Sequence, residues 1–223
     1  RSVCLNNLKQ IGLAVHMYAM DENDALPARN DDLVYGYRGV GNFLWANPTS
    51  FPGGYFPLGR LLIGYRATKH GRYLANPEAL FCPAGKWNKS STRVSMANLK
   101  TYFEVPGCSD YSACSYSLNT AHWRGPFDNV SKGKLSIATK YGYILASDAY
   151  QLSANSMNHM GKDGLPEGYN VLFCDGSVRW SYDTGHKICN NSDLVHKTNT
   201  AYYGDASGNN ANPLWVFTQS TLP

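Results

Sequence analysis

The chain has 223 residues, enough for a substantial hydrophobic core, and its net charge of +4 comes with only 16% charged residues. Lysine and arginine are scattered singly along the sequence, which argues against a nucleic-acid partner because phosphate binding needs a concentrated basic face. No run of eighteen apolar residues is present, so the printed sequence contains no membrane-spanning segment.

An amphipathic helix is predicted over residues 1–20. Its apolar stripe recurs at steps of three and four and comprises Leu5, Leu8, Ile11 and Val15. Polar residues such as Asn7 and Lys9 are expected largely off this stripe. The pattern has no N-cap residue ahead of it, so we expect the helix to continue from a longer upstream segment. Residues 21–27 end the helix with a polar run and a proline.

The middle of the chain predicts long irregular segments with a few short elements. Residues 28–57 are rich in glycine and proline, and aromatic side chains are interleaved over 35–56. A short helix is predicted from Pro57. A brief buried strand is predicted over Leu80–Cys82, where Pro83 ends it.

The second half of the chain favours β structure. Short apolar runs predict strands over Ser115–Leu118 and Tyr141–Ala146. The clearest signal is a hairpin over Tyr169–Tyr182, because two alternating runs flank Asp175-Gly176, a pair typical of a tight type I′ turn. A last strand is predicted over 213–217.

Six cysteines are present, and none forms a Cys-x-x-Cys pair. An even number in a chain poor in charge favours an oxidising compartment with some disulfides, although buried thiols in a reducing compartment remain the alternative. Fifteen complete pairings are available to six cysteines, and the sequence does not choose between them. Cys108 and Cys114 bracket a short loop and are the first pair that we expect to be bonded.

Several stretches together resemble one bacterial family. Residues 4–19 (CLNNLKQIGLAVHMYA) closely resemble the segment after the membrane helix of pseudopilin-like proteins. These are the prepilin-type proteins with a His-X9-Asp-Gly processing-associated region, which are related to the major pseudopilins of type II secretion. Further landmarks in the same order are Leu80–Ala84, Ser115–Asn119, Ala146–Asp148 and Asn170–Trp180. His159 is the natural counterpart of the family histidine, but fifteen residues separate it from Asp175, which indicates a hairpin-like insertion.

The resemblance implies an anchored precursor. Such proteins carry a leader that a prepilin peptidase removes and an apolar N-terminal helix that holds the subunit in the inner membrane. This helix then packs with its copies in a filament. The expected partners are therefore other pseudopilin subunits, secretion machinery, the peptidase and the bacterial inner membrane. The domain itself is expected to be periplasmic or extracellular.

The polar residues suggest one metal hypothesis and a weaker catalytic one. Asp148 and Asp175, with His159, could supply ligands for Ca²⁺, although the simpler interpretation is that these residues stabilise turns and strand ends. The same three residues could form a hydrolase-like trio. No motif places a nucleophile, and no nucleophile elbow, zinc-protease or phosphate-loop motif occurs, so we expect no enzymatic activity.

We therefore expect a single α+β domain over 1–223 of the type IV pilin kind. Residues 1–22 would form a helical spine packed on an antiparallel sheet, and 23–223 a β domain with long loop insertions. The expected function is that of a non-enzymatic structural subunit. The alternative is a membrane-anchored carbohydrate-binding module, which the aromatic residues of 35–56 would serve.

Overall fold

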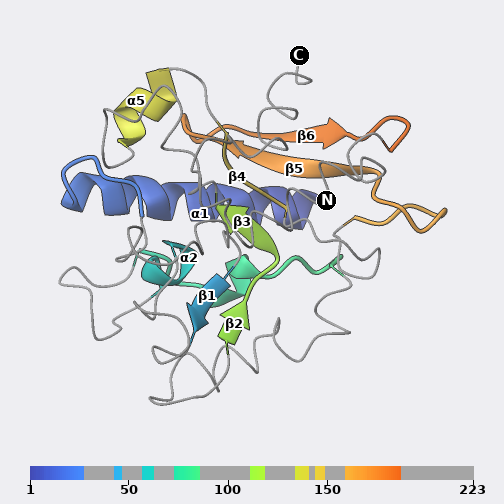
Figure 1. Cartoon of the computed structure of the whole chain (residues 1–223), viewed down its shortest axis with the longest axis horizontal. Helices are drawn as coiled ribbons and strands as arrows, with labels where there is room; N and C mark the ends of the chain where they lie inside the picture. Colours follow the sequence, from blue (N-terminus) through green and yellow to red (C-terminus); the bar gives the residue numbers. More distant parts are fainter. Residues whose placement is uncertain are drawn as a thin grey trace, which may run out of the picture.

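The computed structural model describes an N-terminal helix, two antiparallel sheets and several short helices (Figure 1). The described residues are 1–27, 43–46, 57–62, 73–85, 111–118, 134–140, 144–148 and 159–186. None of the helices in this part of the chain is both long and apolar enough to cross a membrane. The arrangement is α+β, with the N-terminal helix packed on the larger sheet, as the sequence predicts.

Helix α1 spans Ser2–Asp21, in agreement with the prediction. Its buried face comprises Cys4, Asn7, Leu8, Ile11, Gly12, Ala14, Val15, Tyr18 and Ala19. The predicted stripe is confirmed except at Leu5, which is only half buried. The expectation that Asn7 lies off the stripe is wrong, because this side chain is buried and hydrogen-bonded inside the molecule.

The larger sheet has four antiparallel strands in the order β3-β4-β5-β6. Its strands are β3 (Tyr116–Leu118), β4 (Ile144–Asp148), β5 (Gly168–Phe173) and β6 (Val178–Tyr182). The two central strands are covered on both faces, since all of β4 and five of the six residues of β5 are buried. The strand expected over Tyr141–Ala146 is therefore present but begins and ends later.

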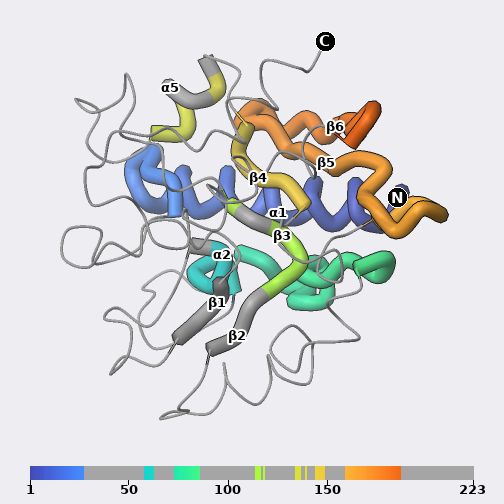
Figure 2. The backbone as a smooth tube through the Cα atoms, turned by 45° about the vertical axis from the view of Figure 1, so that its right-hand side comes forward, coloured from blue at the N-terminus to red at the C-terminus, as the bar shows by residue number. Residues whose placement is uncertain are grey.

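Helix α1 lies along β5, and both views place it between β5 and β6 on one side and the segment around η1 on the other (Figures 1 and 2). The residue that precedes it, Arg1, forms an ion pair with Glu167, just before β5. Near its other end, His16 Nε2 lies 3.0 Å from the carbonyl oxygen of Cys174, just after β5. A Cβ atom on Gly12 would lie 2.9 Å from Leu172 Cδ1, so this glycine allows the close approach of helix and strand.

The hairpin formed by β5 and β6 is confirmed, but the predicted turn type is wrong. A type I′ turn needs positive φ at both central residues, whereas only Gly176 has it, at 83°, and Asp175 does not. The Gly176 N–H donates to the Phe173 carbonyl oxygen at 3.0 Å, and the Phe173 N–H donates to the Ser177 carbonyl oxygen at 2.8 Å. The loop therefore has three residues and ends on a left-handed glycine.

A second hairpin-like insertion precedes β5, as the sequence predicts. Met160 pairs with Pro166 in an antiparallel bridge. The Gly161 N–H donates to the Leu165 carbonyl oxygen at 2.7 Å, and Gly164 adopts a φ of 80° within the turn. This insertion follows His159 directly and leads the chain into β5.

The remaining elements lie on the other side of α1. They are β1 (Phe43–Ala46), which pairs with β2 (Tyr111–Ala113), helix α2 (Pro57–Arg60) and the 3₁₀ helix η1 (Pro77–Leu80). Helix α2 confirms the short helix expected from Pro57. The prediction of a strand over Leu80–Cys82 is wrong, because Leu80 is the last residue of η1. Asn76 caps this 3₁₀ helix by accepting a hydrogen bond from the Glu78 N–H at 3.0 Å.

Helix α5 (Leu135–Lys140), which the sequence analysis did not anticipate, is attached to the end of α1. The backbone N–H of Ser136 donates to Asp24 Oδ1 at 3.0 Å. Thr139 Oγ1 lies 3.0 Å from the Cys174 carbonyl oxygen, so α5 also contacts the hairpin turn. The strand expected over 213–217 lies outside the described residues. So does Cys108, one of the two cysteines of the bond expected between Cys108 and Cys114.

Candidate functional site

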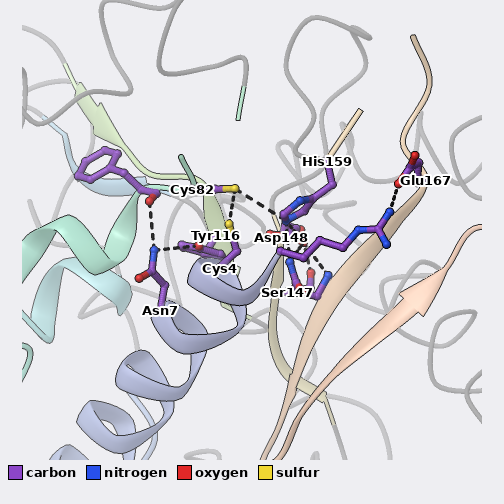
Figure 3. Close-up of polar contacts among 11 residues, drawn as sticks. Cys4, Asn7, Cys82, Tyr116, Ser147, Asp148, His159 and Glu167 are labelled. Atoms are coloured by element: carbon purple, nitrogen blue, oxygen red, sulfur yellow. Dashed lines mark hydrogen bonds and ion pairs between the residues drawn. The ribbon is translucent and has the colours of Figure 1, made fainter. Parts of the chain in front are cut away.

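A buried polar cluster lies beneath the first turn of α1, where the helix crosses the end of the larger sheet (Figure 3). The cluster is formed by Cys4, Cys82, His159, Asp148 and Asn170, which come from five separate stretches of the chain. All five residues are less than a tenth exposed. Buried polar side chains need partners, and most groups of the cluster find them in one another, whereas Asn170 Oδ1 has no hydrogen-bond partner among the described residues.

The two sulfur atoms are in direct contact. Cys4 is on the buried face of α1, and Cys82 follows η1. Their Sγ atoms lie 2.6 Å apart, and both residues are completely buried. His159 Nε2 lies 3.8 Å from Cys82 Sγ, so an imidazole faces the pair (Figure 3).

Asn170 links the histidine to a buried carboxylate. Its backbone N–H and its Nδ2 amide both donate to Asp148 Oδ2, at 2.6 and 2.8 Å. The same Nδ2 lies 2.7 Å from His159 Nε2. One amide group of Asn170 therefore bridges the Asp148 carboxylate and the His159 imidazole.

The side of the cluster nearest η1 is closed by a hydrogen-bonded asparagine and tyrosine. Asn7 Nδ2 lies 3.2 Å from both the Phe81 carbonyl oxygen and the Tyr116 hydroxyl oxygen (Figure 3). Burial raises the pKa of the Tyr116 hydroxyl above its ordinary value, so it stays protonated. These contacts fix α1 against the segment that carries Cys82.

The opposite side of the cluster is closed by aromatic and cationic groups. The Trp180 ring packs edge-on against His159, with ring centroids 5.1 Å apart. The Arg1 guanidinium lies over the Trp180 ring at 4.4 Å, a cation–π arrangement, and its ion pair with Glu167 holds it there. The first residue before α1 thus covers the histidine side of the cluster.

The hydrogen bond between the two thiols shifts their pKa values in opposite directions. The hydrogen bond from the Cys82 thiol lowers the pKa of Cys4 to about 4, and His159 adds to this effect against the cost of burial. The pKa of Cys82 is raised because it keeps the shared proton and is buried. In the reduced state the first ionisation therefore belongs to the pair, and it is favoured by the proton that the two sulfurs share.

Two of the three residues predicted as metal ligands come together. His159 Nε2 lies 3.5 Å from Asp148 Oδ2 within the cluster. Asp175 does not join them, because it lies in the hairpin loop beyond the far end of β5, roughly 16 Å along the strand from Asn170. There its carboxylate accepts a hydrogen bond from the Ser177 N–H at 2.8 Å, which also lowers its pKa. The three residues therefore form neither a shared Ca²⁺ site nor a catalytic trio.

The donor atoms of the cluster suit a softer metal better than Ca²⁺. Calcium takes six to eight oxygen ligands, whereas Cys4 and Cys82 offer sulfur and His159 offers nitrogen. These three ligand atoms lie within 4.8 Å of one another. Calcium binding by Asp148 remains a prediction, and so does sugar binding by residues 35–56, most of which lie outside the described residues.

Sequence reasoning missed the cysteine pair and Asn170. One signal was available, since Cys4 precedes Leu8 by four residues and Ile11 by seven, which places it on the buried stripe. That spacing predicts burial but not the partner, because Cys4 and Cys82 are 78 positions apart. No family model matches this chain, and neither a curated protein nor a solved structure is significantly similar to it.

Proposed function

We propose that this chain is the periplasmic or extracellular part of a pseudopilin-like structural subunit without enzymatic activity. In this proposal a membrane helix continuous with α1 anchors the subunit in the bacterial inner membrane. A prepilin peptidase processes the precursor, and copies of the subunit then associate through their helices. The sequence resemblance over residues 4–19 supports this proposal, as does the packing of α1 on an antiparallel sheet.

The observation that carries the proposal is that the second half of α1, from Leu13 on, is apolar on two sides. One side is buried against β4 and β5. On the other side Leu13, Met17 and Met20 recur at steps of four and three, and they are 65%, 42% and 83% exposed. A helix that only served its own domain would gain stability from polar residues there. An apolar outer stripe is suited to a neighbouring helix in a filament or in the membrane-bound assembly.

The stripe can be tested by crosslinking between copies. The full-length native gene product is produced in its bacterial host with Leu13→Cys or Met17→Cys, and intact cells are treated with a short bis-maleimide. Arg179→Cys is the matched control, because Arg179 is exposed but does not belong to α1. Its guanidinium lies over the Phe173 ring, which packs against an apolar cluster separate from the core that α1 contacts. We expect crosslinked dimers and higher species from the two α1 variants and almost none from Arg179→Cys.

Two results would contradict the proposal. The first is an absence of crosslinked species from both α1 variants when the protein is present at native abundance. The second is an equal yield from Arg179→Cys, since this would indicate random collision rather than contact through the outer stripe.

A further inference from the structure

We propose that Cys4 and Cys82 form a structural disulfide that ties the first turn of α1 to the segment after η1. The distance between their Sγ atoms, 2.6 Å, is well inside the roughly 3.5–4.0 Å at which non-bonded heavy atoms pack best. It exceeds a sulfur–sulfur bond of about 2.05 Å by roughly half an ångström, so only a small movement of the two side chains separates the contact from a bond. This inference does not depend on the proposed function.

The geometry favours a bond over a shared metal ion. Zinc binds sulfur at about 2.3 Å in a tetrahedral arrangement, which separates two sulfur ligands by roughly 3.7 Å. The observed separation of Cys4 and Cys82 is more than an ångström shorter. In addition, His159 Nε2, the third ligand atom of such a site, is already in contact with Asn170 Nδ2 at 2.7 Å. Bringing in a metal would require both contacts to open.

Burial determines when the bond can form. Because both sulfurs are completely buried in the folded protein, a small disulfide oxidant reaches them only before α1 docks. One cysteine thiolate attacks the oxidant RSSR, which forms a mixed disulfide and releases RS⁻. The thiolate of the second cysteine then displaces the second RS⁻, and the two RS⁻ groups take up the two thiol protons. The chain loses two hydrogen atoms and RSSR becomes two RSH.

The surrounding groups suit this chemistry. When docking of α1 brings Cys4 to a mixed disulfide on Cys82, the nearby imidazole of His159 favours the Cys4 thiolate, which is the attacking species of the second step. Once formed, the bond lies between Tyr116 and His159, away from solvent reductants. It closes a loop between two cysteines 78 positions apart, so it restricts the unfolded chain strongly.

Peptide mapping tests the bond without any substitution. The full chain is exported to a bacterial periplasm, purified without reductant, denatured with iodoacetamide and digested with trypsin. Cleavage after Arg1, Lys9, Arg72 and Lys86 gives peptides 2–9 and 73–86, each with one of the two cysteines. We expect the two peptides to be found as one disulfide-linked species, whose mass is two hydrogen masses below the sum of the two peptide masses. Reduction should separate this species into the two peptides. Recovery of both as alkylated peptides would overturn the proposal.

Stability gives a second readout. Wild-type protein is reduced in urea and refolded with reductant, and its Tm is compared with that of the oxidised protein. We expect the Tm to fall by about 5–15 °C. When the double variant Cys4→Ser, Cys82→Ser is reduced and refolded in the same way, its Tm should fall by less than that of the wild-type protein. An equal fall in the two proteins, or purified protein that holds stoichiometric zinc on reduced thiols, would refute the bond.

Discussion

Asn7 makes a buried polar contact between α1 and the rest of the core. Its Nδ2 group serves both the Phe81 carbonyl oxygen and the Tyr116 hydroxyl. Replacing it by alanine leaves these two buried oxygens with one donor fewer. We expect Asn7→Ala to lower the free energy of unfolding by about 1–3 kcal/mol, as measured by urea unfolding.

The neighbouring Asn6 supplies the matched control, because it is exposed on the same helix. The change in helix propensity from asparagine to alanine is the same at both positions, and it favours alanine by roughly half a kcal/mol. Asn6→Ala should therefore leave the unfolding midpoint unchanged or slightly raised. Equal midpoints for the two variants would mean that the contacts of Asn7 contribute nothing to stability.

Cys114 in its reduced form gives a prediction for alkaline pH. Burial raises the pKa of its thiol from 9.0 to about 12. The folded protein therefore holds this proton more tightly than the unfolded chain, so the stabilisation is complete below pH 9 and is lost as pH rises toward 12. Cys114→Ala should reduce the loss of stability between about pH 8 and pH 10.5 by roughly 2 kcal/mol. Urea unfolding at both pH values, with oxygen excluded, measures the difference, and an unchanged loss would contradict the prediction.

The site was only partly predictable at this scale. His159 and Asp148 stood out as polar residues within otherwise apolar or loop segments, and the structure places them together. The residues that complete the cluster did not stand out, since Asn170 and Cys82 look like ordinary members of buried segments. Asp175 was misleading, because the same Asp-Gly pair that predicts a hairpin also looks like a carboxylate ligand.

At the scale of elements, Leu8 and Leu13 lie on different faces of α1. Leu8 is completely buried against the core, whereas Leu13 is 65% exposed. Leu8→Ala should cost about 2–5 kcal/mol, because it removes buried apolar area and leaves a cavity. Leu13→Ala should cost less than about 0.5 kcal/mol. Thermal and urea unfolding of the two variants measure this contrast, and similar losses would show that the assignment of the two faces is wrong.

The elements that the sequence predicts well are those whose signal is local. Helix α1 and the hairpin of β5 and β6 each follow a regular period of apolar residues. Helix α5 was missed because it is short and its attachment runs from Ser136 to Asp24, 112 positions away. At η1 the local cue was present, since Asn76 and Pro77 are typical of a helix start, but the apolar run that follows resembles a strand.

At the scale of the whole molecule, α1 joins the larger sheet to the segment around η1. Its inner face contacts the larger sheet and the segment around η1, and its first turn lies over the buried cluster (Figures 1 and 3). A pull on the N-terminal end of this helix would act first on Cys4 and on the contacts of Arg1. A covalent tie there would hold the domain to an anchoring helix under load.

The anchored, processed subunit is the central claim, and the fate of the full-length native gene product tests it most directly. The product is expressed in bacteria with and without an active prepilin peptidase, and each culture is examined by membrane fractionation and intact-mass measurement. We expect the protein in the inner-membrane fraction of both, with the mass of a short leader lost only where the peptidase is active. A product that keeps its precursor mass in both cultures, or that is recovered in the soluble fraction, would contradict the claim.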